Sequence, residues 1–424
     1  MRTALRIVLA LLLLVAAFLA AWWVWILRRD ERLRETWKQE IFDGVEPAER
    51  FPARQPNRTA LEIERLAAGL GLDFSTGARE AVVPTEAAAA RWERVAPLLK
   101  EHTWVLRANT LDQPPVASAE LEAFVVEHGG SLARVRDLLV TAPPPSWELH
   151  LERGVEAPLP NYIAQLQLHR LLGVSAHRKL DVDDEAAAAI YLEAAWRLGR
   201  DPAENPLMIA RLIRLSEIGD EIVAFRRFCS PPSSWHSRLE SLDPRPGILR
   251  ALQIEGWAVH AVELPLGEGG SLSRSWQRMM FVPLGETVQH SVERLRTEDP
   301  LTLDFEHFTE EEQRQIPRWA PFSRSLYPNL FDAWSKALRA ELAAEHALLV
   351  LEARRRLAGG ETIAGSRRPS TAVPGLFWLT EATETGVRIA LDGGLDDQPK
   401  HSVSLDLTIA RAGCGEETAL RASS

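Results

Sequence analysis

An uninterrupted apolar run near the N-terminus constrains this chain more than any other feature. It extends from Ile7 to Leu27 and contains 21 residues. As an α-helix, such a run is roughly 30 Å long, which matches the hydrocarbon thickness of a bilayer. Arg2 and Arg6 precede it, and Trp22 lies with two further tryptophans near its far end, where indole rings favour the headgroup layer. We therefore expect residues 7–27 to bind a lipid bilayer as a single transmembrane signal-anchor.

A cleavable signal peptide is the alternative interpretation of this run. Such a peptide has a shorter apolar region and small residues before the cleavage site. The sequence Val15-Ala-Ala17 could serve as that site, but ten more apolar residues follow it. The length of the run therefore favours an uncleaved anchor.

The basic residues beside the run give conflicting indications of membrane orientation. Those that follow it are Arg28, Arg29, Arg32, Arg34 and Lys38. They outnumber Arg2 and Arg6, and the positive-inside rule would then keep the body of the protein in the cytoplasm. The short basic tail before the run is instead typical of a signal-anchor. We expect a single-pass protein of the cytoplasmic (inner) membrane with an extracytoplasmic body, and the cytoplasmic orientation remains the alternative.

Composition and charge exclude some classes of partner. The formal net charge of −10 argues against nucleic acid, because phosphate binding requires a basic face. Charged residues form 25% of the chain and apolar residues 46%, which is the balance of a folded globular protein. The two cysteines, Cys229 and Cys414, do not have the spacing of a metal site, but they could form one disulfide.

The changes in character along the chain predict four regions. We expect the transmembrane signal-anchor at 1–28 and a juxtamembrane stalk and linker at 29–58. An α-helical body should occupy 59–358, followed by a linker and a small β region at 359–424. The fold class is therefore mainly α, with an N-terminal transmembrane helix and a small antiparallel β element at the C-terminus.

The stretch from Asp181 to Cys229 predicts the centre of the helical body. An alanine-rich helix over 185–198 should end at Gly199, and a second helix should begin with Asn205 as its N-cap and Pro206 in its first turn. Because the alanine face permits close approach, we expect these two helices to form an antiparallel hairpin. Residues 189–202 also resemble the second helix of a tetratricopeptide (TPR) repeat, which implies a TPR-like body, although no comparable helix recurs 34 residues later.

Apolar periodicity predicts the remaining elements. The further helices that we expect are 61–70, 86–100, 118–128, 132–140, 161–173, 246–263, 273–297 and 330–358, with a break near Pro283. Thr85 and Ser118 are candidate caps of the second and third of these helices. Short strands are expected at 375–379, 386–391 and 403–409. Two proline-rich sequences resemble each other: Ala142-Pro-Pro-Pro-Ser-Trp147 and Ser230-Pro-Pro-Ser-Ser-Trp235. We interpret each as a helix terminator with a tryptophan packed over the helix end. A duplicated helical unit is the alternative.

Two segments carry a family resemblance. The sequence from Tyr162 to Phe228, with Leu-Leu-Gly-Val-Ser and Pro-Leu-Met-Ile-Ala-Arg-Leu-Ile, resembles a group of uncharacterised membrane-anchored bacterial proteins, and so does the segment 328–356. In many of these proteins the long helix leads to a strand region similar to the C-terminal part of type II secretion pseudopilins. The resemblance covers about half of the chain and implies no known activity. Residues 2–25 lack the pseudopilin processing-site pattern, which speaks against a pilus subunit.

Candidate metal ligands lie in two acidic segments. Asp392, Asp396 and Asp397 belong to a glycine-bearing loop between two expected strands, and the pseudopilin-like resemblance implies a calcium loop there. A solvated turn is the alternative, because Asp and Gly tolerate left-handed backbone. The second segment, Asp181 to Glu185, could also collect calcium, but its position before a helix favours capping.

Signatures of catalysis are missing from the sequence. It contains no Gly-x-Ser-x-Gly, phosphate loop, His-Glu-x-x-His or dinucleotide fingerprint, and we expect no cofactor. Asp304, Glu306 and His307 place acids beside an imidazole, and His290 and Glu293 share a helix face, but neither set has enough partners to define a site. We therefore expect a non-enzymatic interaction or assembly protein of the cell envelope with a protein partner. An envelope hydrolase or metal-dependent enzyme is the alternative, and a secretion-apparatus component is a third.

Overall fold

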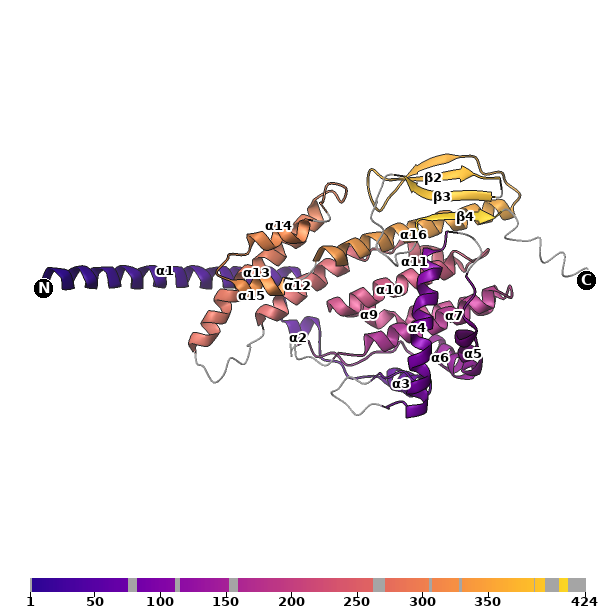
Figure 1. Ribbon diagram of the computed structural model, residues 1–424, viewed down its shortest axis with the longest axis horizontal. Helices are drawn as coiled ribbons and strands as arrows, with labels where there is room; N and C mark the ends of the chain where they lie inside the picture. Colours follow the sequence, from indigo (N-terminus) through magenta and orange to yellow (C-terminus); the bar gives the residue numbers. More distant parts are fainter. Residues whose placement is uncertain are drawn as a thin grey trace, which may run out of the picture. The chain divides into compact units, whose positions relative to one another are not determined.

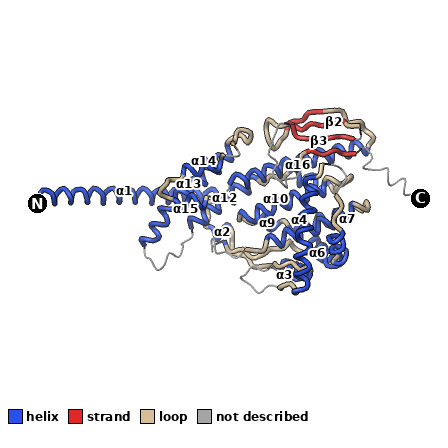
Figure 2. The backbone as a smooth tube through the Cα atoms, viewed as in Figure 1, coloured by secondary structure: helices blue, strands red, loops and turns tan. Residues whose placement is uncertain are grey.

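The computed structural model describes residues 2–74, 82–110, 115–151, 159–261, 271–304, 307–327, 330–384, 386–392 and 404–410. The protein is mainly helical and has one small four-stranded antiparallel sheet (Figures 1 and 2). Contacts divide the chain into two compact units. Unit 1 comprises Met1–Ala53, His150–Ala157 and Leu249–Asp332, and unit 2 comprises Arg54–Leu149, Pro158–Ile248 and Ala333–Ser424.

Unit 1 is built from six helices among its described residues. They are α1 (Arg2–Glu40), α2 (Pro47–Arg50), most of α12 (Arg245–Ala261), α13 (Ser271–Thr297), α14 (Phe308–Gln315) and α15 (Pro321–Leu326). Helix α13 continues through Pro283, so the predicted break is wrong. The neighbours Val282 and Leu284 are buried, and this packing holds the helix together where the proline removes a backbone hydrogen bond. The sequence did not predict α14 and α15, which are short and mostly polar.

Helix α1 is continuous and is long and apolar enough to cross a bilayer. The side chains of the apolar run are exposed up to Leu19, whereas Ile26, Leu33 and Trp37 are buried on one face. At Gly285 of α13, an added Cβ would lie 2.6 Å from the Trp37 ring, so only glycine permits this close approach. The helical part of the expected stalk is therefore packed against α13.

Unit 2 contains most of the remaining helices and the sheet. Its elements are α3 (Arg58–Gly69), α4 (Glu86–Ala108), α5 (Ala119–Glu127), α6 (Gly129–Thr141), α7 (Tyr162–Leu180), α8 (Glu185–Leu198), α9 (Arg200–Glu204), α10 (Met208–Phe225), α11 (Ser233–Glu240), most of α16 (Leu330–Ala358), β1 (Ser366–Pro369), β2 (Phe377–Ala382), β3 (Gly386–Asp392) and β4 (Asp406–Ala410). The predicted caps at Thr85 and Ser118 are confirmed, since each side chain accepts a backbone N–H of the first turn.

Helix α7 is the central element of unit 2. It packs most extensively against α8 and also against α10, while α8 and α10 contact each other less. The main helical pair is thus α7 with α8, rather than the expected α8 with α10. Asn205 also differs from the prediction, because α10 begins at Met208 with Leu207 as its N-cap. The Asn205 amide instead donates to the Tyr162 hydroxyl of α7 at 2.6 Å, which joins the loop to that helix.

The sheet is an antiparallel meander in the order β1-β2-β3-β4, and it packs on α16. Strand β1 was not predicted, because the first strand that we expected begins at residue 375 and the residues before it were expected to be linker. This edge strand is fully exposed, so it lacks the apolar alternation that predicts a strand. The buried His346 of α16 stacks on Trp378 of β2, with ring centroids 5.2 Å apart, and its Nε2 lies 3.1 Å from the Ile389 carbonyl oxygen.

A buried group of charges joins α7 to α10. Arg214 contacts the Glu221 carboxylate through Nη1 at 2.7 Å and Nη2 at 3.0 Å, and Glu217 at 3.4 Å. His169 Nε2 lies 3.0 Å from the same Glu221 carboxylate. All four side chains are buried. Burial raises the pKa of Glu217. Burial also acts to raise the pKa of Glu221, but the nearby Arg214 and His169 outweigh it, so the pKa of Glu221 is lowered. Arg214 is therefore the cation that makes two buried carboxylates tolerable in this core.

We expect Arg214→Ala to lower the free energy of unfolding by about 3–5 kcal/mol, because two buried carboxylates lose their cation. The control is Arg200→Ala, which removes an exposed arginine that pairs with Glu204 at 3.1 Å and should cost at most about 1 kcal/mol. Urea unfolding in mild detergent, followed by circular dichroism, measures both. Equal losses in the two variants would contradict the assigned role of Arg214.

Candidate functional site

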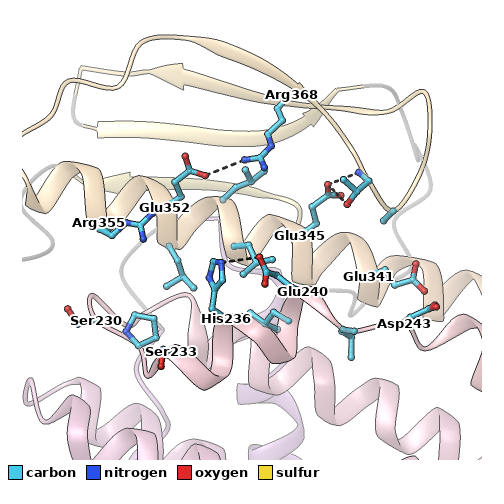
Figure 3. Close-up of a pocket in the computed structure, with 18 of the residues that line it drawn as sticks. Ser230, Ser233, His236, Glu240, Asp243, Glu341, Glu345, Glu352, Arg355 and Arg368 are labelled. Carbon is cyan, nitrogen blue, oxygen red and sulfur yellow. Dashed lines mark hydrogen bonds and ion pairs between the residues drawn. The ribbon is translucent and has the colours of Figure 1, made fainter.

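The main cleft of unit 2 lies between α11 and α16, below the loop that joins β1 to β2 (Figure 3). Its volume is about 990 Å³. The apolar lining includes Leu239, Leu242, Leu348, Leu349 and Leu351, and the charged lining comprises Glu240, Asp243, Arg245, Glu341, Glu345, Glu352, Arg355 and Arg368, with His236 beside them. An apolar floor with a charged rim is typical of a surface that binds another molecule.

A proline-rich turn positions the α11 wall of the cleft. Ser230-Pro-Pro follows α10, and the Glu185 carboxylate holds the turn by accepting the backbone N–H groups of Cys229 at 2.6 Å and Ser230 at 3.2 Å. The fully buried Trp235 then packs against Phe225 at the end of α10 and against Trp196. This contact supports the interpretation of the motif as a helix terminator with a packed tryptophan. It also orients His236 and Glu240 toward the cleft.

Helical spacing positions the opposite wall. Glu341, Glu345 and Glu352 lie at intervals of four and seven residues and so share one face of α16, together with Leu348. Glu345 accepts hydrogen bonds from Ser370 Oγ at 2.6 Å and from Thr371 N at 2.7 Å, which ties the β1–β2 loop to the helix. This carboxylate is consequently part of the frame of the cleft.

One end of the cleft is acidic. Glu341 is only 6% exposed and pairs with Arg245 Nη2 at 2.7 Å. Burial raises the pKa of Glu341 to about 7, and Asp243 adds to the shift while Arg245 opposes it. The Asp243 carboxylate is exposed and makes no hydrogen bond or ion pair with any residue that the structure describes. It is therefore available to a basic group of a ligand.

The other end presents a cation. Figure 3 shows Arg355 far from Asp243 along α16. Its guanidinium is exposed and has no ion-pair partner within the described ranges, whereas the nearby Glu352 pairs with Arg368 at 3.3 Å. His236 Nε2 lies 3.3 Å from the Glu240 carboxylate between the two ends. The cleft thus has an acidic end and a basic end joined by a leucine-lined floor.

The structure describes only part of the predicted calcium loop. Asp392 ends β3 and pairs with Arg367 at 3.2 Å, while Asp396 and Asp397 lie outside the described residues. In the part of the chain that the structure describes, no group of three His, Cys, Asp or Glu residues is placed to hold a metal ion. The calcium loop at Asp392, Asp396 and Asp397 stays a prediction.

The second acidic segment has helix-end contacts. Asp184 accepts the N–H of Ala187 at 3.1 Å as the N-cap of α8. Asp181 pairs with Arg227 at 2.6 Å, and Glu185 binds the turn after α10. These carboxylates point to different partners, which agrees with the capping interpretation. Cys229, at the same turn, is disulfide-bonded, and Cys414 lies outside the described residues.

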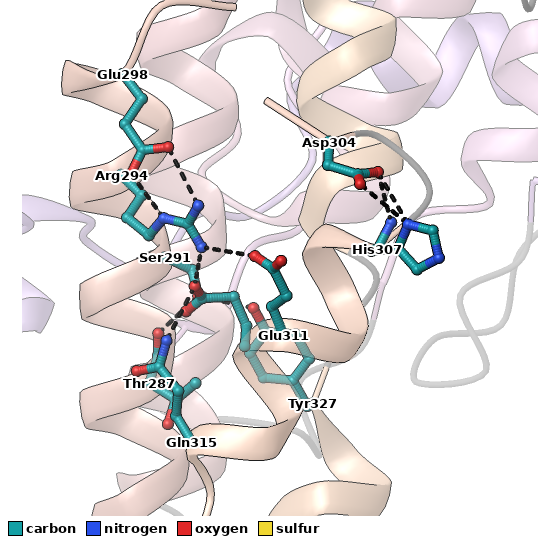
Figure 4. Close-up of polar contacts among 10 residues, drawn as sticks. Thr287, Ser291, Arg294, Glu298, Asp304, His307, Glu311, Gln315 and Tyr327 are labelled. Atoms are coloured by element: carbon teal, nitrogen blue, oxygen red, sulfur yellow. Dashed lines mark hydrogen bonds and ion pairs between the residues drawn. The ribbon is translucent and has the colours of Figure 1, made fainter. Parts of the chain in front are cut away.

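The structure brings together two of the three residues first considered for an enzyme. His307 Nδ1 lies 3.0 Å from Asp304, and both side chains are more than half exposed (Figure 4). Glu306 lies outside the described residues. The neighbouring buried network connects Ser291 to Glu312 and to Tyr327, with oxygen–oxygen distances of 2.7 Å. Its hydroxyl and carboxylate groups satisfy one another, which indicates a structural role.

His290 and Glu293 lie elsewhere, on a groove of about 480 Å³ in unit 1 that α1 and α13 line. Arg29 pairs there with Glu286. Neither His290 nor Glu293 meets the additional ligands that a metal site would need among the described residues.

Comparison with known proteins does not identify the chain: no family model, no curated protein and no solved structure matches it. The resemblance to membrane-anchored bacterial proteins and to pseudopilins stays a prediction.

The cleft was not identified from the sequence, because Arg245 and Glu341 are 96 residues apart and meet only in the fold. The one local signal was the repeat of glutamates on an otherwise apolar face of α16.

We expect Glu341→Gln to change the pH dependence of stability. Because the pKa of Glu341 is raised to about 7, its stabilising contribution is complete below the unfolded-state pKa and is lost as the pH rises through 7. Between pH 5 and pH 8 the wild type should therefore lose up to about 3 kcal/mol relative to Glu341→Gln.

Thermal melting across this range measures the effect. The control is Glu352→Gln, on the same wall, where the carboxylate is 44% exposed; it should retain the wild-type pH profile. A Glu341→Gln variant with the same profile as the wild type would contradict the assignment.

Proposed function

We propose that this chain is a membrane-anchored interaction or assembly protein of the cell envelope and that it is not an enzyme. Residues 7–27 anchor it in the cytoplasmic membrane as a single pass, and the body lies outside the cytoplasm. The cleft between α11 and α16 binds a segment of a partner protein. The α7–α8 pair supports the further proposal that unit 2 is a helical-hairpin, TPR-like body.

The observation that carries this proposal is the form of the cleft. From Glu341 to Arg355 its α16 wall spans 15 residues, and the 14 helical rises between them correspond to about 21 Å. This length suits a helix of about four turns or an extended segment of about six residues. The leucine floor requires an apolar ligand face, and the exposed Asp243 and Arg355 call for a basic group at one end and an acidic group at the other. A short amphipathic protein segment combines these properties.

An envelope hydrolase is the alternative from a different class. The observation that favours it is a serine, an imidazole and a carboxylate (Ser233, His236 and Glu240) on one wall of the cleft. Against it, His236 and Glu240 are at least half exposed, and Ser233 makes no hydrogen bond to His236. Labelling of Ser233 by a fluorophosphonate probe would favour the hydrolase. A metal-dependent enzyme would instead require calcium or another cation at the Asp392 loop.

A secretion-apparatus component is a further alternative. It requires the C-terminal sheet to pack against the long helix in a pilin-like way, and the contacts of His346 with Trp378 and Ile389 are consistent with that packing. Against it, residues 2–25 lack the processing-site pattern of pseudopilins.

We expect a photoreactive benzoylphenylalanine at Leu349, on the cleft floor, to cross-link a protein of constant mass in intact membranes. The control position is Ile190, which is 45% exposed on α8 of the same unit and should give no adduct. Asp243→Lys should lower the yield at position 349 at least several-fold by repelling the basic end of the ligand, whereas Glu101→Lys on α4 should not. Equal adducts at both positions, or none at 349, would oppose the proposal.

We also expect alkaline phosphatase fused to the C-terminus to be active in cells, because the enzyme needs disulfides that form only outside the cytoplasm. A matched green fluorescent protein fusion should be dark after export through the general secretory route. A fluorescent fusion together with inactive phosphatase would reverse the orientation to the one that the positive-inside rule favours.

A further inference from the structure

Unit 1 begins to pack against α1 before the apolar run ends. Trp22 and Trp23 are half-buried, and Ile26 is 1% exposed, whereas the preceding apolar side chains are exposed. Leu27, which ends the run, lies five residues after Trp22. This overlap corresponds to about 8 Å along the helix axis. If the run fills the hydrocarbon layer, part of unit 1 must therefore lie at the depth of the membrane interface.

One described part of unit 1 that lies beside this end of the run is the turn of residues 317–320, between α14 and α15. The Trp319 ring packs edge-on against the Trp22 ring, with centroids 5.8 Å apart. The N–H of Ala320 donates to the Pro317 carbonyl at 2.9 Å, and Ala320 is buried, so the turn is fixed to its unit. Trp319 nevertheless remains 38% exposed, so part of its ring is free to contact a second surface.

The charges around this turn suit a lipid surface. Arg318 is exposed and forms no ion pair within the described ranges. On α1, the Arg29 guanidinium lies 4.2 Å from the centre of the Trp25 ring, and Trp25 is 49% exposed. Indole rings concentrate at the boundary between headgroups and acyl chains, and arginine side chains extend from there to phosphate groups. Arg29 pairs with Glu286, so Arg318 is the cation of the two that is available to phosphate, while Trp25 and Trp319 present exposed indole rings from two elements of one unit.

We propose that the turn of residues 317–320 is a second membrane contact of this protein. Trp319 inserts at the headgroup boundary of the leaflet nearest the body, and Arg318 binds lipid phosphate. Unit 1 is thus seated on the bilayer by α1 and by this turn together. The proposal rests on the membrane anchoring proposed above, and it adds a contact that the apolar run does not supply.

The test uses the full-length protein in nanodiscs of phosphatidylethanolamine and phosphatidylglycerol, made with ordinary or with acyl-brominated lipid. Bromine quenches tryptophan at the membrane, so the quenched fluorescence amplitude reports the indoles that touch lipid. Trp319→Phe preserves an aromatic ring, and Trp104→Phe in α4 of unit 2 is the matched control. With Trp22, Trp23, Trp25 and Trp319 at the interface, Trp319→Phe should remove roughly a quarter of the quenched amplitude, and Trp104→Phe should leave it unchanged.

The outcomes separate this inference from the anchor. Wild-type quenching that Trp319→Phe does not reduce would overturn the second contact while leaving the anchor intact. An absence of quenching in the wild type would overturn the anchor itself, and the second contact with it. Circular dichroism of both variants ensures that a lost amplitude is compared between equally folded proteins.

Discussion

The buried ion group of Arg214, Glu217, Glu221 and His169 is the interaction on which unit 2 most depends. Two carboxylates inside a helical core would be strongly unfavourable in isolation, and one guanidinium makes them compatible with burial. The imidazole comes from α7 and the other three groups from α10, so the arrangement fixes how these helices meet. Gly199 belongs to the same arrangement, because a Cβ there would lie 2.4 Å from the Arg214 guanidinium. Gly199 is the C-cap of α8, and its missing side chain leaves the space that the Arg214 guanidinium occupies beside the end of this helix.

Helix α16 connects that core to the proposed binding surface. One part of its surface supports the sheet through His346, whose pKa burial lowers well below its usual value, so the ring packs as a neutral group. Another part presents Glu341, Glu345 and Leu348 to the cleft. Because Glu345 also holds the β1–β2 loop, the sheet and the cleft wall are mechanically linked. A ligand in the cleft would therefore contact elements whose relative positions are already fixed, which lowers the entropic cost of binding.

Helix α1 combines two roles along one continuous element. Its exposed apolar surface suits lipid up to Leu19, and from Ile26 the buried face belongs to unit 1. The change occurs within the apolar run itself, at the tryptophans that would otherwise be interpreted only as a membrane-interface belt. Trp22 contacts Trp319, while Trp25 contacts Arg29. An indole can contact protein on one side and lipid on the other, so these residues are compatible both with the packing of unit 1 and with the proposed membrane interface.

The sequence by itself determined the elements whose signals are local. The apolar run, the bounds of 185–198 and 330–358, the caps Thr85 and Ser118, and three of the four strands follow from periodicity, capping chemistry and composition, which act over a few residues. The sequence did not determine which helices pair, because the alanine face of α8 can pack against α7 as well as against α10. It also did not determine β1, because that strand has a polar, exposed sequence and is stabilised by its pairing with β2. The cleft depended on tertiary structure, because Arg245 and Glu341 must meet across 96 residues and Glu341 acquires its raised pKa only when the fold excludes water from it.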